Sequence, residues 1–245
     1  MICPPATHSG HYDCDNQTGW FDFAPLLGGG SVQAVLSQRK GDYVGVSLAE
    51  RRDILARQRG LAPERIAVPQ QVHGGKVELA VAGMVHPDTD GLITNDPRIV
   101  LSLQVADCAP VFLYHPPTRF RGLVHAGWRG VTVGVLSTGA DLLQARGVDL
   151  CQVEVVIGPT IEMACYEVGP EVVEAFSPTT WQPHSNGRFT LDLVAVVREQ
   201  LIGAGIAAAK ITSVDVCTYC DPRCHSYRRE GEQAGRMVAF YYVKP

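Results

Sequence analysis

Short runs of β-branched and alternating apolar residues recur along the chain, separated by stretches with helical periodicity. The runs predict strands at 66–72, 77–81, 99–105, 111–114, 120–125, 153–157, 211–216 and 237–243. Helices are expected from a capping box at Ser47 and Glu50 to a stop at Gly60, and over 131–146, 171–176 and 192–202, the last with Asp192 placed to cap it. Strands and helices interleave without a strict βαβ rhythm and without the glycine pattern of a dinucleotide site. The sequence therefore predicts a mixed-sheet α/β domain rather than a Rossmann unit.

The size and composition are those of an ordinary globular chain, with 245 residues, 46% hydrophobic and 19% charged. We expect one folded domain over 31–245. The first 30 residues hold Pro4, Pro5 and a run of glycines at 28–30 among scattered aromatic residues. Such a segment is expected to form an irregular N-terminal arm.

Charge and hydropathy exclude several kinds of partner. The net charge is −4, and the densest basic groups are the pairs Arg51-Arg52 and Arg228-Arg229, so nucleic-acid binding is not expected. No apolar run approaches the roughly 20 residues that cross a membrane, and the first residues lack the pattern of a signal peptide. We therefore expect a cytoplasmic protein, whose eight cysteines are thiols, metal ligands or a nucleophile rather than disulfides.

Three turns beside predicted strand ends each carry one soft or borderline metal ligand, namely His73, Cys108 and His125. Two imidazoles and one thiolate fit a catalytic zinc site, which has three protein ligands and one open position, and the mixed nitrogen and sulfur set also suits copper. The spacing matches no short zinc motif. From spacing alone, a hydrogen-bonded turn residue is the more ordinary interpretation of each histidine.

A glycine-lined turn at 127–130 precedes the predicted helix at 131–146. Free amides at a helix start and the guanidinium of Arg129 suit an anion such as phosphate. The glycines alone would also explain a tight turn with a solvated arginine.

Two further groups of cysteine and histidine lie near the chain ends. The segment 217–225 contains Cys217, Cys220, Cys224 and His225, but four ligands within nine residues need an unusually tight loop. No second CxxC exists, so we expect reduced thiols there rather than a structural zinc. The N-terminal group has the ligand types of zinc but lies in the expected arm, so no specific metal is expected; it comprises Cys3, His8, His11 and Cys14.

Short motifs stand in a fixed order along most of the chain. The first four are QVHG at 71–74, DTDGLIT at 88–94, ADCAP at 106–110 and HAGWRG at 125–130. The others are IGP at 157–159, YEVG at 166–169, CTYC at 217–220, SYRR at 226–229 and GR at 235–236. In order and spacing, over about residues 66–243, they resemble the bacterial laccase-domain family. That family is also described as multicopper polyphenol oxidoreductases and as purine nucleoside phosphorylases.

The resemblance implies a single-domain, layered α-β-β-α sandwich, similar to the cysteine-hydrolase-like fold of certain bacterial toxins. It implies that His73, Cys108 and His125 hold one zinc or copper ion. It also implies phosphorolysis of adenosine, inosine, guanosine and methylthioadenosine, together with adenosine deamination. The expected partners are therefore a nucleoside and phosphate, and the expected oligomeric state is a monomer or weak dimer.

Roles for other residues follow from the chemistry that these reactions need. Asp107, beside Cys108, is the candidate for moving protons during deamination, with a structural carboxylate as the equal alternative. Arg129 and Arg228 are expected to bind phosphate. Tyr166 and Glu167 are expected to shape the pocket or contact sugar hydroxyls, unless they serve only in packing.

One segment departs from the family pattern. Family members carry a segment like STRxGGVS, followed by an SLNL stretch, ahead of the first motif, whereas 37–45 reads SQRKGDYVG. By this resemblance, Arg39 is expected to stand in for the motif arginine in the substrate site. The glycine-rich and asparagine-containing part is absent, which leaves nucleoside specificity open.

The sequence is also compatible with three other functions. Cys108 can act as a nucleophile with His125 or His73 as base, giving a cysteine-type hydrolase that edits peptidoglycan precursors. A copper-dependent phenol oxidase is a further alternative, although the chain has only eight histidines and no dense His-x-His pattern. A non-catalytic binding protein is the third alternative, made plausible by the shortened segment.

Overall fold

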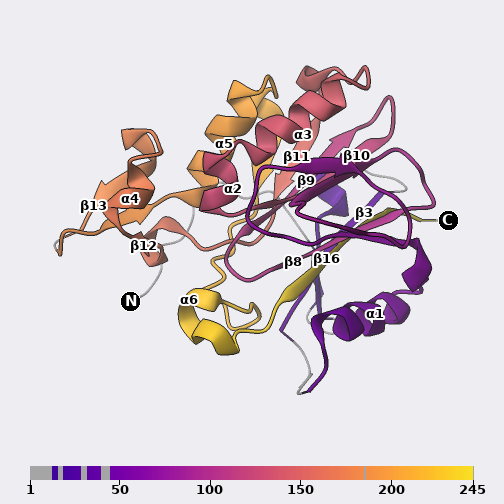
Figure 1. Cartoon of the computed structure of the whole chain (residues 1–245), viewed down its shortest axis with the longest axis horizontal. Coiled ribbons are helices and arrows are strands. Elements are labelled where there is room, and N and C mark those ends of the chain that lie inside the picture. The colour runs from indigo at the N-terminus through magenta and orange to yellow at the C-terminus, as the bar shows by residue number, and fades with distance from the viewer. Residues whose placement is uncertain (1–12, 16–18, 29–31, 40–44, 185, 245) are drawn as a thin grey trace.

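The computed structural model describes residues 13–15, 19–28, 32–39, 45–184 and 186–244. Within these residues two main β-sheets stack on each other, and helices cover both outer faces. In Figure 1, helices α2 (Trp128–Thr132), α3 (Val135–Gln144) and α5 (Leu193–Gly203) lie on one side of the strands, and α1 (Leu48–Gln58) lies on the other. The expected α-β-β-α sandwich is confirmed.

The first main sheet has seven strands in the order β1-β2-β3-β16-β8-β4-β6. Its central strand β16 (Met237–Val243) pairs antiparallel with β3 (Val32–Ser37) and with β8 (Val100–Val105). Strand β4 (Ile66–Pro69) runs parallel to β8 and to β6 (Val85–His86). The other edge is formed by β2 (Trp20–Asp22) and β1 (Asp13–Asp15).

The second main sheet has six strands in the order β15-β11-β9-β10-β7-β5. Strands β9 (Ala109–His115) and β10 (Phe120–Ala126) form its central antiparallel pair. The flanking strands are β11 (Glu154–Ile157), β15 (Ile211–Ser213), β7 (Gly91–Thr94) and β5 (Val77–Leu79). Both antiparallel and parallel pairs occur, as expected for mixed sheets.

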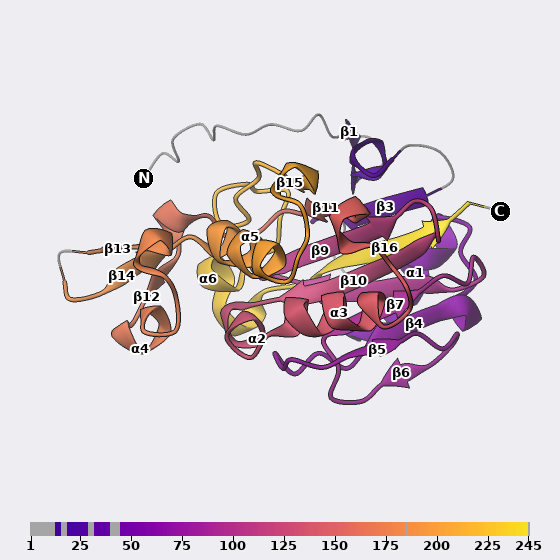
Figure 2. The same ribbon diagram turned by 90° about the horizontal axis from the view of Figure 1, so that it is seen from above.

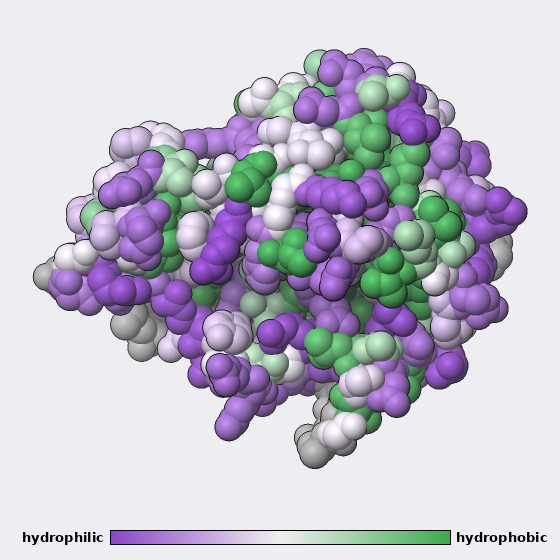
Figure 3. All heavy atoms as spheres, viewed as in Figure 1, coloured by the Kyte–Doolittle hydropathy of each residue, from purple (hydrophilic) through white to green (hydrophobic). Residues whose placement is uncertain are grey.

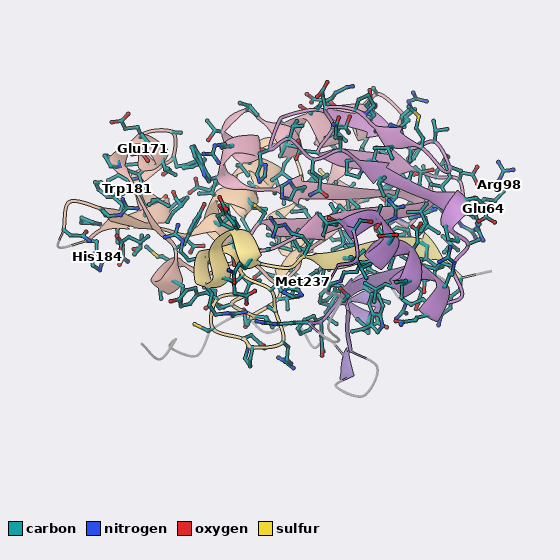
Figure 4. All side chains as sticks on the ribbon, turned by 60° about the horizontal axis from the view of Figure 1, so that its bottom comes forward. Glu64, Arg98, Glu171, Trp181, His184 and Met237 are labelled. Atoms are coloured by element: carbon teal, nitrogen blue, oxygen red, sulfur yellow. The ribbon has the colours of Figure 1, made fainter. Side chains whose placement is uncertain are left out.

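Alternation of side chains along β16 explains the layering. Val238 and Phe240 pack with Leu55 of α1 in one core, while Met237 and Tyr241 face the second sheet in another. Figure 4 shows Met237 near the middle of the molecule. A third core joins the far face of the second sheet to α3 and α5. Met237, Val238 and Phe240 have no exposed surface. Burying each of these side chains contributes about 1.5–3 kcal/mol to the stability of the fold.

The first and fifth α-helices begin at the side-chain caps that the sequence predicts. The Ser47 side chain accepts a hydrogen bond from the Glu50 amide, and Glu50 bonds back to the Ser47 backbone. Asp192 caps α5 by accepting a 2.9 Å hydrogen bond from the amide of Ala195. The helix expected over 131–146 is instead split into α2 and α3, because Gly134 adopts a left-handed backbone with φ 82°.

A small three-stranded sheet projects from one end of the molecule (Figure 2). It consists of β12 (Glu167–Val168), β14 (Phe189–Leu191) and β13 (Trp181–Pro183), accompanied by α4 (Pro170–Val173). Trp181 and Phe189 pack edge to face, with ring centroids 5.1 Å apart. In Figure 4 the labelled residues of this unit lie at the end opposite Glu64 and Arg98.

The remaining helical elements are short. The C-terminal motif forms α6 (Tyr227–Glu230). Turns of 3₁₀ helix occur at Ala24–Leu26, Pro63–Arg65, Leu150–Gln152, Met163–Cys165, Pro178–Thr180, Ala208–Lys210 and Gly231–Gln233. No helix in the described part of the chain is long and apolar enough to span a membrane.

The N-terminal region differs from the expected irregular arm over 1–30. Strand β2 belongs to the first main sheet, and Phe21, Phe23 and Leu27 are fully buried. These apolar side chains fill the core between the sheets, which is why the segment is ordered although its proline and glycine content suggests a loop. Residues 1–12, 16–18 and 29–31 lie outside the described residues, so the expectation is not tested there.

Candidate metal centre

Three residues from separate turns and strands meet at one point between the two main sheets. His73 lies in the turn after β4, Cys108 immediately precedes β9, and His125 lies near the end of β10. Their candidate ligand atoms all lie within 4.8 Å of one another. The imidazole centroids of His73 and His125 are 4.8 Å apart, with the rings inclined at 75°. The structure therefore brings together the three residues that the sequence singles out as ligands.

A buried carboxylate behind the cluster orients it. Asp90 has no exposed surface, and its Oδ1 accepts a 2.8 Å hydrogen bond from Nδ1 of His125. With Nδ1 occupied in this way, Nε2 is the imidazole nitrogen of His125 that remains for a metal. The same carboxylate accepts hydrogen bonds from the amides of Val72, His73 and Gly74, at 2.7–3.0 Å. Asp90 thus fixes both histidines.

The backbone at two site positions adopts an unfavourable conformation. His73 has φ 59° and Asp107, beside Cys108, has φ 85°, in the left-handed region that side-chain-bearing residues rarely adopt. The Asp90 contacts hold the first of these conformations. Gln71 helps to hold the same turn, because its side-chain amide bonds to the backbone N and O of Gln104 at 2.9 and 2.7 Å. Such conformations persist only where the surroundings enforce them.

A glycine allows the close approach of the thiol. A Cβ atom at Gly127 would lie 2.7 Å from Sγ of Cys108 and 3.3 Å from the His73 ring. No side chain fits there without displacing a candidate ligand. The glycine that begins α2 is therefore required by packing against the site.

The charges in the cluster favour a thiolate. Burial raises the pKa of the Cys108 thiol, but the facing imidazoles of His125 and His73 outweigh burial and hold the pKa at about 6. Burial lowers the pKa of His125, while Cys108 and Asp90 raise it, and the result is about 9. A thiolate beside imidazole nitrogens is the form that binds a metal or attacks an electrophile.

The cluster lies in the wall of a cavity of about 880 Å³. The cavity lies between the start of α1, the beginning of α2 and α6, which supply Leu48, Trp128 and Tyr227. Around the cavity, on the face shown in Figure 3, hydrophobic side chains form small groups among hydrophilic ones. A site of this size accepts a small organic molecule.

Four of the other expected site residues line this cavity, namely Asp107, Arg129, Tyr166 and Arg228. The guanidinium of Arg129 lies over the Trp128 ring, 4.6 Å from its centroid. That of Arg228 lies 5.4 Å from the centroid of the Tyr166 ring and donates to the carbonyl of Glu167 at 2.6 Å. Burial and the nearby Cys108 raise the pKa of the Tyr166 phenol, which keeps it neutral.

Asp107 lines the cavity, but its carboxylate already has partners. Oδ1 accepts a 2.6 Å hydrogen bond from the Thr218 hydroxyl, and Oδ2 accepts a 2.7 Å bond from the amide of Arg228. These bonds tie the turn before β9 to the C-terminal motif. The geometry therefore favours the structural alternative over the proton carrier.

Two expected substrate-binding side chains point to other partners. Arg39 forms an ion pair with Glu230 at 2.5 Å, and the Glu167 carboxylate pairs with Arg188 at 2.6 Å. Neither residue lines the cavity. Glu167 contributes through its backbone carbonyl instead, and residues 40–44 of the shortened segment lie outside the described residues.

Sequence reasoning missed Asp90 as a site residue. Its signal is the DTDG motif at 88–91, because a metal-bound histidine needs a carboxylate or carbonyl partner for its second nitrogen. It also missed a second cluster, formed by Cys165, Cys217 and Cys220.

The layered fold and a His/Cys cluster in a cavity wall define a single-domain α/β protein with a candidate mononuclear metal centre. The chain belongs to the multi-copper polyphenol oxidoreductase laccase family, whose model matches residues 35–244. The family resemblance drawn from the motifs is thereby confirmed.

Curated relatives carry the names of two nucleoside enzymes. The chain is 32% identical to the purine nucleoside phosphorylase YlmD of Geobacillus stearothermophilus, over 87% of this chain and 86% of the relative. It is 29% identical to the adenosine deaminase RL5 of an unknown prokaryotic organism, over 83% of this chain and 86% of the relative.

Solved structures share the fold. The crystal structure of YlmD from Geobacillus stearothermophilus matches with a TM-score of 0.86 at 29% identity, covering 96% of this chain and 99% of that one. The Neisseria meningitidis protein NMB0706 matches with a TM-score of 0.76 at 26% identity, covering 88% of this chain and 95% of that one.

Proposed function

We propose that this chain is a metal-dependent purine nucleoside enzyme. It phosphorolyses adenosine, inosine, guanosine and methylthioadenosine, and it deaminates adenosine. The observation that carries the proposal is the cluster of His73, Cys108 and His125 in the wall of a cavity of about 880 Å³. The names of the relatives, a purine nucleoside phosphorylase and an adenosine deaminase, support the same substrate class.

The donor set fits one zinc ion, and copper is the second choice. Two imidazoles and one thiolate leave one coordination position open, and the exposed His73 faces the cavity from which substrate would enter. Asp90 supplies the outer partner that such a site needs. When bound, zinc supplies Lewis-acid activation of a water nucleophile for deamination.

The cavity also has groups suited to phosphorolysis. Among the described residues, the Arg129 guanidinium has no hydrogen bond or ion pair, so its donors are available for phosphate. Arg228 donates a hydrogen bond to the Glu167 carbonyl, and its guanidinium lies beside the Tyr166 ring. The neutral phenol of Tyr166 is a donor for a sugar hydroxyl.

Asp107 acts as a positioning residue in this proposal. Its carboxylate accepts hydrogen bonds from the Thr218 hydroxyl and the Arg228 amide, which ties the turn that carries Cys108 to the C-terminal motif. A cavity group other than Asp107 then donates the proton to the departing amine.

The test is adenosine turnover in phosphate buffer, with adenine and inosine separated by chromatography. We expect both products, a loss of turnover on chelation, and recovery when zinc is returned. Cys108→Ser should abolish the zinc-restored turnover, whereas Cys151→Ser should retain it, because Cys151 is exposed and lies outside the cavity. Chelator-resistant turnover, or no turnover at any metal content, would contradict the proposal.

A second candidate function rests on the electrostatics of Cys108. A thiol with a pKa near 6, beside His125 with a pKa near 9, also fits a nucleophile that forms a covalent acyl intermediate. Such a cysteine-type hydrolase would act on an amide of a peptidoglycan precursor. It would keep activity in chelator, and it would be trapped as an adduct on Cys108 visible by mass spectrometry.

A further inference from the structure

A second group of sulfur ligands lies outside the metal centre described above. Cys165 ends the 3₁₀ turn Met163–Cys165, and Cys217 and Cys220 lie in the CTYC motif more than 50 positions later. The Sγ atoms of Cys165 and Cys220 are 3.3 Å apart, and the three sulfurs all lie within 4.8 Å of one another. The fold thus unites thiols that the sequence keeps far apart.

The spacing of the sulfurs suits a metal. Zinc–sulfur bonds of about 2.3 Å in a tetrahedron place neighbouring sulfurs about 3.8 Å apart. The Cys165–Cys220 pair, at 3.3 Å, is closer than this spacing, and the 4.8 Å limit on the whole cluster lies above it, so small side-chain shifts would bring the three sulfurs to a bound ion. No disulfide joins these three cysteines. Cys217 is buried, while Cys220 is exposed, so the cluster extends from the interior to the surface.

The backbone holds the CTYC loop in a defined turn. The amide of Asp221 donates to the carbonyl of Cys217 at 2.9 Å, and the amide of Thr218 donates to the carbonyl of Thr160 at 3.0 Å. Cys217 also forms an isolated β-bridge with Thr160. These contacts fix the positions from which Cys217 and Cys220 present their sulfurs.

We propose that Cys165, Cys217 and Cys220 form a second metal site for one thiophilic ion, Zn²⁺ or Cu⁺. Three soft thiolates select these ions over hard cations such as Mg²⁺. The sequence alone favours reduced thiols here, because four ligands within 217–225 need an unusually tight loop and no second CxxC exists; the structure brings the third sulfur from Cys165, outside that segment. Cys224 is fully buried away from the cluster and takes no part in the site.

The ion would tie together two segments that line the cavity. Cys165 directly precedes Tyr166, and the loop carrying Cys217 and Cys220 leads to Arg228 in α6. Arg229 holds the same loop by donating to the carbonyls of Thr218, Tyr219 and Cys224. A metal bound by the three thiols would therefore connect the cavity-lining segment that carries Tyr166 to the loop that leads to Arg228.

The test separates this site from the first one by using His73→Ala/Cys108→Ser as the parent variant. The reduced, metal-free parent is titrated anaerobically with Zn²⁺ alone and with Cu⁺ alone, in competition with a chelator of known affinity. We expect one ion per chain and a metal-dependent rise in Tm. Adding Cys220→Ser or Cys165→Ser should lower the metal affinity by at least about 100-fold. Losing only an outer hydrogen-bond partner of a ligand already costs up to that much, and here a ligand itself is lost.

Two controls keep the proposal falsifiable. Adding Cys151→Ser should leave binding unchanged, because this exposed cysteine lies outside the cluster. Circular dichroism of each variant shows whether it is folded, and Cys165→Ser replaces Cys220→Ser if only one folds. Absence of binding by the parent, equal binding after Cys220→Ser, or a Cys165–Cys220 disulfide formed in place of metal binding would overturn it.

Discussion

The Asp90 carboxylate accepts a 2.8 Å hydrogen bond from Nδ1 of His125 while three backbone amides of the 72–74 turn donate to the same carboxylate. One buried side chain therefore fixes a ligand from the second sheet and the turn that carries His73 from the first. The carboxylate thus links both histidines of the candidate metal centre, and we expect metal binding to depend on it.

Asp90→Asn tests that dependence. An amide keeps one acceptor oxygen but turns an NH₂ group toward backbone donors, so we expect zinc affinity to fall about 10–100-fold. Competition titration against a chelator measures the change. Asp88→Asn is the matched control, because this exposed carboxylate lies two positions away and should leave zinc affinity unchanged. Equal affinity in both variants would contradict the role given to Asp90.

Gly127→Ala tests the close approach of the thiol. The added Cβ would lie 2.7 Å from Sγ of Cys108, so we expect unfolding free energy to fall by about 1–3 kcal/mol and zinc affinity to fall with it. Urea denaturation measures the stability. Gly203→Ala, where no atom lies within 4 Å of the added Cβ, should be neutral or slightly stabilising. A Gly127→Ala protein as stable as the parent would show that the site tolerates a side chain.

The pH dependence of Cys108 alkylation follows from its environment. In metal-free protein the pKa of this thiol lies at about 6, so the reactive thiolate is minor below pH 6 and dominant above it. The iodoacetamide rate should rise from pH 5 to about pH 7 and then level off, whereas an ordinary thiol gains reactivity up to about pH 8.5. Peptide mass spectrometry follows this one cysteine.

Two changes should alter that profile. Bound zinc should block the alkylation, and His125→Ala should move the rise to higher pH because the facing imidazole is lost. A rate that keeps rising through pH 9 in the metal-free protein would contradict the thiolate assignment.

Arg129→Ala separates phosphorolysis from deamination. Loss of a charge-assisted contact to phosphate costs about 1.5–3 kcal/mol, so we expect kcat/KM for phosphate to fall about 10–100-fold. Inosine formation in phosphate-free buffer should change little. Arg146→Ala, at an exposed arginine just after α3, serves as the control. An equal fall in both reactions would assign Arg129 to nucleoside binding or to folding instead.

Local signals in the sequence predicted much of the fold. The Ser47 capping box and the Asp192 cap each depend on contacts within three positions, and both are present. The strand over 237–243 is found with the expected bounds, because its alternating side chains pack into two different cores.

Features that depend on distant contacts were not predictable in the same way. Strands β3 and β2 owe their order to pairing with β16 and with each other, which a local pattern does not contain. The break between α2 and α3 depends on one residue, Gly134, in a left-handed conformation, and the helical pattern around it does not reveal the break.

The candidate site shows the same division. His73, Cys108 and His125 stood out by residue type and motif, but Arg39 and Glu167 found ion-pair partners elsewhere that no motif reveals. The contact between Cys165 and Cys220 joins residues 55 positions apart, so the CxxC motif alone did not indicate Cys165 as a partner.

X-ray absorption at the zinc edge tests the central claim most directly, on Cys220→Ser protein so that the second cluster does not contribute. The expected first shell contains two nitrogens at about 2.0–2.1 Å and one sulfur at about 2.3 Å, with one further light atom. The sulfur signal should vanish when Cys108→Ser is added. A shell without sulfur, a shell of sulfur alone, or no bound metal after zinc loading would contradict the assignment of His73, Cys108 and His125 as the metal centre.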